Sequence, residues 1–213
     1  MNIALFSLMA GAGLTLVGAA LSEVLFAADF ETARTDELPP EFTTIDGRFA
    51  VREEEGNRFI ESPAAPVDAY RLLVGPAAAD NVSAAVRVFG TATGRRYPAF
   101  GIGLHGAAGY RLQISPGKRR IELWKGDEEK AGAPFAWQPN QWLWLRIELA
   151  RMAEGLWQVR GRAWPDGQTE PATWILSVQE TSAPRPGRVT IMACPIAGTP
   201  IRYDDIKIET LGR

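Results

Sequence analysis

Residues 141–149, Gln-Trp-Leu-Trp-Leu-Arg-Ile-Glu-Leu, decide the fold of this chain. Leucine or isoleucine occupies every second position, and tryptophan, arginine and glutamate occupy most positions between them. Successive side chains of a β-strand point to opposite faces of its sheet, so this alternation predicts a strand with one face against a hydrophobic core. An amphipathic helix would instead repeat its apolar residues about every three or four positions.

The same short alternating runs continue on both sides of this stretch. Strands are predicted at 23–30, 47–52, 58–62, 70–74, 81–89, 97–105, 109–115, 119–125, 141–149, 156–164, 174–178, 187–194 and 201–209. Residues 115–118 (Ser-Pro-Gly-Lys) and 164–167 (Trp-Pro-Asp-Gly) predict tight turns, because proline presets one turn position and glycine accepts a positive φ. About a dozen short strands at this spacing are typical of an antiparallel two-sheet sandwich. We therefore expect one all-β domain over residues 23–210.

The nineteen residues 3–21 carry no charge. As a helix they would span about 28 Å, close to the hydrocarbon thickness of a bilayer. One interpretation is a signal peptide cleaved before Glu23, for which Ala20-Leu21-Ser22 has suitably spaced small residues. The other is a retained transmembrane anchor over residues 1–22, favoured by the length of the run and by the absence of Lys and Arg before it. We adopt the anchor and keep the signal peptide as the alternative.

A retained helix would have its own contacts and orientation. Small residues recur every fourth position on one helical face, at Ser7, Gly11, Thr15 and Ala19. Such a stripe allows a second transmembrane helix to approach closely. Residues 22–41 carry six acidic side chains and one arginine. Because Lys and Arg normally stay in the cytoplasm, we expect an inner-membrane anchor with the body in the periplasm of a bacterial envelope.

Composition limits the chemistry of the partners. The net charge is −2, so no general affinity for polyanions and no nucleic-acid partner are expected. The chain has one cysteine, Cys194. An internal disulfide therefore cannot form, and packing must stabilise the domain.

Several stretches, taken in order, resemble a known fold family. They are 25–31 (LFAADFE), 38–42 (LPPEF), 46–51 (DGRFAV), 100–104 (FGIGL), 109–112 (GYRL), 142–147 (WLWLRI) and 203–206 (YDDI). Together they resemble the concanavalin A-like lectin/glucanase jelly roll, in particular its laminin-G-like and 3-keto-disaccharide-hydrolase-like branches, from Val24 to Glu209. The resemblance implies a jelly-roll sandwich. It also implies a glycan-binding or sugar-hydrolysing role, although a fold alone does not fix a function.

The polar faces of four predicted strands are rich in tryptophan and arginine. With regular alternation, the residues pointing away from the core in 109–115, 119–125, 141–149 and 156–164 form one binding face. Its members are Trp124, Trp142, Trp144, Trp164, Arg111, Arg120, Arg146, Arg160, Arg162, Gln113 and Gln158. Indoles on the outside of a sheet need a cover, which a ligand, a partner protein or a segment such as 126–140 would supply.

Catalytic and metal-binding residues are harder to place. The glucanase branch uses carboxylates spaced along one strand, and the nearest match is 122–129 (ELWKGDEE). Trp124 stands where the central acid is needed, so Glu122 is interpreted as a partner of nearby arginines and no catalytic residue is assigned. Asp204-Asp205 could contribute to a calcium site, as in some relatives of the fold, although adjacent strand residues point to opposite faces. No other cofactor is expected.

These observations favour a non-catalytic function. We expect a membrane-anchored accessory or structural subunit that docks onto a membrane protein complex through its helix and its Trp/Arg face. Two linked contacts raise the effective concentration of each, so modest contacts can give stable assembly. The alternative is a secreted or anchored glycan-binding module, or a glycoside or keto-glycoside hydrolase, in which the same aromatic face stacks on sugar rings.

Overall fold

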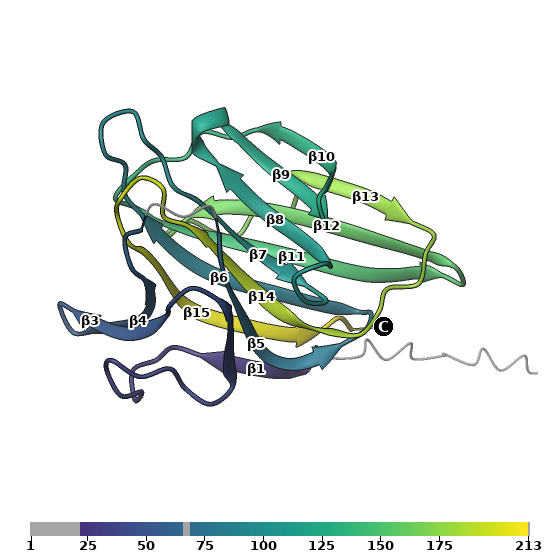
Figure 1. Cartoon of the computed structure of the whole chain (residues 1–213). Helices are drawn as coiled ribbons and strands as arrows, with labels where there is room; N and C mark the ends of the chain where they lie inside the picture. The colour runs from purple at the N-terminus through teal and green to yellow at the C-terminus, as the bar shows by residue number, and fades with distance from the viewer. Residues whose placement is uncertain (1–21, 66–68, 213) are drawn as a thin grey trace, which may run out of the picture.

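The computed structural model describes residues 22–65 and 69–212, which form an all-β sandwich of two antiparallel sheets (Figure 1). The predicted anchor, with its stripe of Ser7, Gly11, Thr15 and Ala19, lies outside the described residues. Within the two described ranges, no helix has the length and apolar character needed to cross a membrane. The helical structure recorded there is one 3₁₀ turn, η1 (Pro116–Lys118).

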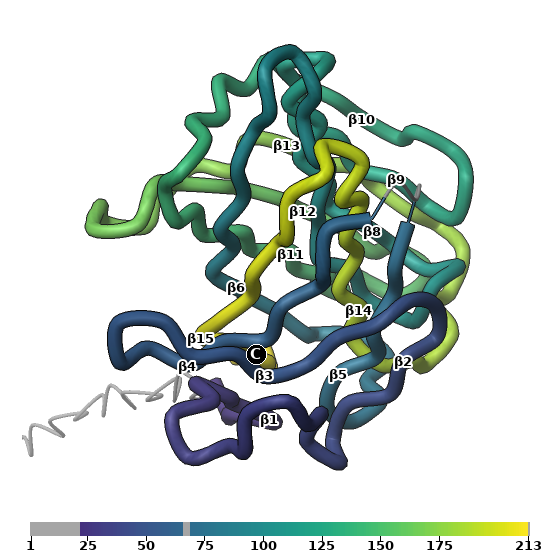
Figure 2. Tube along the Cα trace, turned by 60° about the vertical axis from the view of Figure 1, so that its left-hand side comes forward, coloured from purple at the N-terminus to yellow at the C-terminus, as the bar shows by residue number. Residues whose placement is uncertain are grey.

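Sheet A has the strand order β13-β12-β11-β6-β15-β4-β3, and β1 also pairs with β15. Its strands are β1 (Val24–Ala28), β3 (Ala50–Glu54), β4 (Asn57–Ser62), β6 (Val82–Gly90), β11 (Trp142–Ala153), β12 (Leu156–Pro165), β13 (Leu176–Glu180) and β15 (Ile201–Thr210). Figure 2 shows the first strand, in purple, close to the last strand, in yellow, and the two are paired antiparallel. The first and last strands therefore lie side by side in the same sheet.

Sheet B has the strand order β10-β9-β8-β7-β14-β5-β2. Its strands are β2 (Phe42–Asp46), β5 (Tyr70–Ala78), β7 (Ala99–Leu104), β8 (Tyr110–Ser115), β9 (Arg120–Lys125), β10 (Glu128–Pro134) and β14 (Gly187–Cys194). The predicted turn at 115–118 joins β8 to β9, which pair along their whole length. Arg119 follows this turn with a φ of 53°.

The core between the sheets confirms the predicted alternation. In β11, the residues Leu143, Leu145, Ile147 and Leu149 are buried, and the corresponding apolar residues of β8 and β9 are fully buried. Burying these side chains contributes roughly 1.5–3 kcal/mol each before the entropy cost of folding. The period of two thus predicts the core-facing side of β8, β9 and β11 correctly.

Two strands were not predicted, and both lie at the edge of sheet B. β2 (Phe42–Asp46) has one buried residue, Phe42, and β10 (Glu128–Pro134) has none. Their backbones pair with β5 and β9. An edge strand needs little apolar burial, so its sequence shows no alternating signal. The prediction that 126–140 could cover an outer face is wrong, because β10 extends sheet B and Trp137 is buried beside Phe100 in the core.

Candidate functional site

The predicted binding residues do not share one face. β8 and β9 belong to sheet B, whereas β11 and β12 belong to sheet A. Residues that point away from the core therefore lie on opposite outer surfaces of the sandwich. Alternation shows whether a side chain points toward the core, but it carries no information on which sheet the strand joins. The expectation of one continuous Trp/Arg face is thus corrected to two separate groups.

The polar residues on the outer face of sheet B bond to one another around Glu122. This carboxylate has no exposed surface. It accepts hydrogen bonds from the Ser115 hydroxyl at 2.8 Å, the Lys118 ammonium at 3.1 Å and the Trp124 indole at 3.2 Å. Burial favours the neutral acid, but these donors and the charge of Lys118 outweigh burial and lower the pKa of Glu122. These contacts join β8, the 115–118 turn and β9. They do not favour the raised pKa that a general acid needs.

The remaining predicted residues of sheet B are also paired. The Arg111 guanidinium lies 5.4 Å from the centre of the Trp124 ring and donates to the Gln113 amide oxygen at 3.0 Å. Arg120 forms an ion pair with Glu129 at 2.7 Å. Trp124 therefore lies among cations and a carboxylate of its own sheet.

The sheet A group contains a stacked pair of indoles. The Trp144 and Trp164 rings lie 6.0 Å apart, centre to centre, with only 9° between their planes. They stand at the same register position on β11 and β12. The Trp144 indole donates to the Asp166 carboxylate at 2.8 Å. Asp166 belongs to the predicted Pro-Asp-Gly turn, where Gly167 has a φ of 78°, so this turn sets the position of the indole pair.

Trp142 lies apart from that pair. Its ring lies 5.4 Å from Phe89 and 6.2 Å from Phe59, and the Arg87 guanidinium lies over it at 4.6 Å. Gln158 donates to Ser177 on the neighbouring strand β13. These two predicted residues make local contacts on sheet A.

The loop between β12 and β13 folds over part of sheet A. The indole of Trp174 packs against two guanidiniums, 4.0 Å from Arg162 and 4.8 Å from Arg160. Arg162 also donates to the Pro171 carbonyl, and Arg160 pairs with Glu148. This loop, rather than 126–140, covers outward-facing residues of β12.

Arg146 and Glu170 bring this loop to the edge of a pocket. The Arg146 guanidinium lies 2.8 Å from the Glu170 carboxylate, and Arg162 contacts the same carboxylate at 2.5 Å. Arg146 also donates to Ser83 and to Glu209 on the neighbouring strands. Arg146, Glu170, Trp144 and Trp164 all line one pocket.

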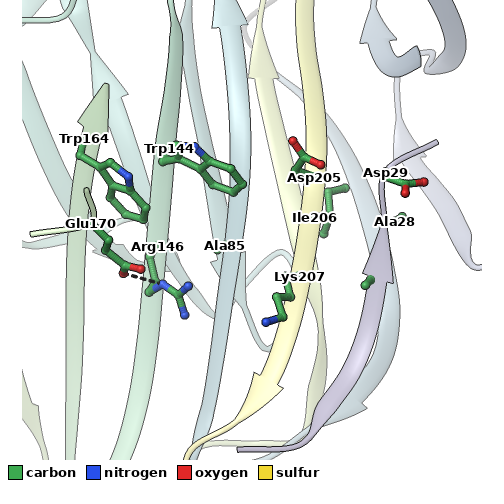
Figure 3. Close-up of a pocket in the computed structure, with 11 residues that line it drawn as sticks. Ala28, Asp29, Ala85, Trp144, Arg146, Trp164, Glu170, Asp205, Ile206 and Lys207 are labelled. Carbon is green, nitrogen blue, oxygen red and sulfur yellow. Dashed lines mark ion pairs between the residues drawn. The ribbon is translucent and has the colours of Figure 1, made fainter. Parts of the chain in front are cut away.

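The sheet A pocket has a volume of about 540 Å³ and crosses several strands (Figure 3). Its lining residues are Ala27, Ala28, Asp29, Ala85, Trp144, Arg146, Trp164, Glu170, Asp205, Ile206 and Lys207. In Figure 3 the indoles and Arg146 lie on one side of Ala85, and Asp205 and Lys207 lie on the other side. Ala85 pairs with Arg146 on β11 and with Lys207 on β15. Because the methyl group of Ala85 is much shorter than the side chains of Arg146 and Lys207 on either side, the outer face of sheet A has a depression at this position.

A β-bulge places the two aspartates of β15 on the same guanidinium. The register between β15 and β6 shifts between Asp204 and Lys207, and Asp205 has a φ of 48°. Arg87 contacts the Asp204 carboxylate at 2.7 Å and the Asp205 carboxylate at 2.9 Å. The prediction that these acids point to opposite faces is therefore wrong, because a bulge inserts a residue and breaks the alternation.

The charges near the bulge shift two pKa values. Burial and the neighbouring Asp204 carboxylate raise the pKa of Asp205, although Arg87 opposes them. Burial disfavours the charged form of Arg87, but the hydrogen bond with Asp204 and the three nearby carboxylates outweigh burial and raise its pKa. Arg87 is therefore charged at any physiological pH.

Asp204 and Asp205 do not fit a calcium ion at this place. Calcium requires about six to eight oxygen ligands around one point. Here the guanidinium of Arg87 lies where the carboxylates converge. Across residues 22–65 and 69–212, no group of three or more His, Cys, Asp or Glu side chains is placed to hold a metal.

Sequence reasoning missed five residues of the pocket that carry its shape or charge. These are Asp29, Ala85, Glu170, Asp205 as a pocket residue, and Lys207. Glu170 belongs to a loop and Ala85 is a small residue in an apolar strand, so neither gives a pattern. The Asp204-Asp205 pair was predicted as a possible contributor to a calcium site, and this is the one sequence signal that fell on any of these five residues.

Comparison with known proteins supports the fold. No protein-family model matches the sequence, and the search of curated proteins found no match. Among solved structures, the carbohydrate-binding module CBM66 from Bacillus subtilis has 10% identity and a TM-score of 0.56, over 80% of this chain and 96% of that one. The catalytic domain of a glycoside hydrolase family 131 protein from Coprinopsis cinerea has 11% identity and a TM-score of 0.55, over 89% and 97%.

A third similar structure is the exoplasmic/lumenal domain of VIP36 bound to Ca²⁺ and Man3GlcNAc. It has 10% identity and a TM-score of 0.53, over 83% of this chain and 86% of that one. At such identities the likeness concerns the fold alone. The chain therefore has the concanavalin A-like jelly-roll fold that its sequence resembles.

Proposed function

We propose that this chain binds a glycan in the sheet A pocket. The observation that carries the proposal is the stacked pair Trp144 and Trp164, which lines a pocket whose other side carries Asp205 and Lys207. Ligand pockets of this size combine an apolar or aromatic surface with a few placed polar groups. A sugar ring offers both an apolar face, which can stack on an indole, and hydroxyl groups, which can bond to the polar side chains.

The charge of the pocket favours a neutral sugar over a polyanion. The lining carries three carboxylates and two cations, so its formal charges nearly cancel; they are Asp29, Glu170, Asp205, Arg146 and Lys207. Arg146 is already paired with Glu170. Carboxylates accept hydrogen bonds from hydroxyls, and ammonium and guanidinium groups donate to them, so a hydroxyl-rich neutral ligand uses both signs. The similarity to the carbohydrate-binding module CBM66 and to the VIP36 domain bound to Man3GlcNAc supports a carbohydrate ligand.

The direct test is a screen of the full-length chain, in mild detergent, against an array of neutral and acidic oligosaccharides. The glycan with the strongest signal would then be titrated by calorimetry into the wild type and into Trp144→Ala. We expect a neutral glycan to bind and the variant to lose most of the affinity. No binding to any array member, or equal affinity of both proteins, would contradict the proposal.

Hydrolysis of a glycan is a second candidate function. Two of the three carboxylates that line the pocket lie in different environments. Glu170 pairs with two arginines, whereas burial and the Asp204 carboxylate raise the pKa of Asp205 against the charge of Arg87. Glycosidases use one ionised and one protonated carboxyl group. The test is to incubate the bound glycan with wild type and Asp205→Asn and to measure new reducing ends. A product formed only by the wild type would favour hydrolysis, and intact glycan with both would exclude it.

We also propose that residues 1–22 hold the domain at the inner membrane, with the body in the periplasm. The uncharged run 3–21 and the acidic segment after it support this location. N-terminal sequencing of the mature protein tests it: a sequence starting at Glu23 would show cleavage. Docking onto a membrane protein complex stays a prediction, and purification in mild detergent would show whether such a complex follows the chain.

A further inference from the structure

We propose that Arg87 is a positioning residue that fixes both sides of the sheet A pocket. The inference concerns the same pocket as the proposed function, but its test needs no glycan. Arg87 is on the central strand β6, and its side chain is only 18% exposed.

Four oxygen-bearing groups surround the Arg87 guanidinium. Its Nη2 lies 2.7 Å from Asp204 Oδ2, its Nε lies 2.9 Å from Asp205 Oδ2, and its Nη1 lies 3.3 Å from Asp166 Oδ2. Nη2 also lies 3.5 Å from the Asn57 amide oxygen. Its flat face lies over Trp142 at 4.6 Å. Three carboxylates, from a turn and a bulge, therefore converge on one fixed cation.

Two of these carboxylates reach opposite sides of the pocket. Asp166 contacts Arg87 through Oδ2, and its Oδ1 accepts the hydrogen bond from the Trp144 indole at 2.8 Å. Asp205 contacts Arg87 and lines the pocket on the side opposite the indoles. Trp144, Asp166, Arg87 and Asp205 thus form one connected set, and the guanidinium links its two halves.

The choice of cation has a chemical consequence. A guanidinium presents N–H donors in a fixed plane and keeps its charge, whereas a bound calcium ion leaves when its concentration falls. If Arg87 were absent, Asp166, Asp204 and Asp205 would repel one another. The orientation of Trp144 should therefore depend on Arg87 and should not depend on calcium.

The test uses the full-length chain in mild detergent and follows circular dichroism and thermal unfolding. Stacked indoles give an exciton band, which is assigned to Trp144 and Trp164 by its loss in Trp164→Phe. We expect the wild type to keep this band and its melting temperature after a chelator and again after added Ca²⁺. We expect Arg87→Met to lose most of the band, and Arg202→Met to keep it. Arg202 is a matched control, because it pairs with Glu54 and Glu61 and lies over Phe59, outside the pocket.

If Arg87→Met does not fold, the variant Asp166→Ala tests the same link between Arg87 and Trp144. Asp166 is in an exposed turn, so Asp166→Ala should fold and should weaken the exciton band by freeing the Trp144 indole. A wild-type band or melting temperature that falls with chelator and returns with Ca²⁺ would overturn the inference. An unchanged band in Arg87→Met or in Asp166→Ala would overturn it as well. Because no readout uses a sugar, failure here is separate from failure of the proposed glycan binding.

Discussion

The outer faces of sheet A and sheet B both carry tryptophan beside arginine and a carboxylate. On sheet B, Trp124 donates to the buried Glu122 and lies beside Arg111 and Lys118. On sheet A, Trp144 stacks on Trp164 at the side of an open pocket. Similar residue types therefore give a closed structural cluster on one face and a candidate binding site on the other.

The neighbours of each tryptophan explain the difference. On sheet B, the polar residues beside Trp124 come from the paired strands β8 and β9 and satisfy one another. On sheet A, the small Ala85 separates Arg146 from Lys207 and leaves a gap between them. A polar and aromatic strand face can form a binding pocket when a small residue on the neighbouring strand leaves space beside it.

The largest expected effect separates the two faces by ligand affinity. Trp144→Ala removes the stacking surface of the pocket, and hot-spot residues of this kind contribute about 2 kcal/mol or more. We expect roughly a 30-fold loss of affinity for the selected glycan, measured by calorimetry. Trp124→Ala is the matched control and should bind the glycan as the wild type does. Equal losses in both variants would erase the distinction between the faces.

The second prediction concerns the free energy of unfolding and a variant in sheet B. Glu122→Gln places an amide against several hydrogen-bond donors in a site without exposed surface. We expect the free energy of unfolding, measured in urea, to fall by about 1–3 kcal/mol. The control Glu129→Gln breaks a more exposed ion pair with Arg120 and should cost about 0–1 kcal/mol. Glycan affinity should be unchanged in both, and a loss of affinity in Glu122→Gln would link sheet B to the site.

The third prediction sharpens the role of the gap on sheet A. Ala85→Leu adds a branched side chain between Arg146 and Lys207 and reduces the pocket. We expect about a tenfold loss of glycan affinity, equivalent to about 1.4 kcal/mol, with a cooperative unfolding transition retained. Ala150→Leu serves as the control, because Ala150 is on the same face of sheet A in the neighbouring strand β11 and lies outside this pocket. Unchanged affinity in Ala85→Leu would show that the ligand binds elsewhere.

The smallest effect is a change in the pH dependence of stability. The pKa of Glu122 is lowered below 4.5, so its contribution to stability is present above 4.5 and is lost as the pH falls through the folded-state pKa. The pKa of Asp205 is raised above 3.8, so its contribution is present below 3.8 and is lost as the pH rises. Urea unfolding at a series of acidic pH values should therefore show a shallower acid loss in Glu122→Gln and a steeper one in Asp205→Asn. The same slope change in both variants would contradict these assignments.

Much of the fold was predictable from the sequence, because alternation and turn residues act locally. The period of two identified most strands and the inward-facing residues of β8, β9 and β11 correctly. The division of strands between sheets was not predictable, since it depends on pairings between distant segments such as β6 and β15. The edge strands β2 and β10 lacked a signal because they bury few side chains.

The candidate site was predicted only in part, for reasons that particular residues make clear. The alternating pattern identified Trp144, Trp164 and Arg146, because each stands between apolar residues of a predicted strand. Asp204 and Asp205 were predicted to point to opposite faces, because a bulge with a φ of 48° at Asp205 is not visible in a regular pattern. Glu170 reaches the pocket from a loop, whose path depends on contacts with Arg146 and Arg162.

The most direct test of the central claim is an NMR titration of the indole N–H signals of the full-length chain with the selected glycan. Assignments would come from single Trp→Phe variants. We predict that the signals of Trp144 and Trp164 move with the same dissociation constant as in the calorimetric titration, while the Trp124 signal stays in place. Movement of the Trp124 signal, with unchanged signals of Trp144 and Trp164, would contradict the assignment of the site to sheet A.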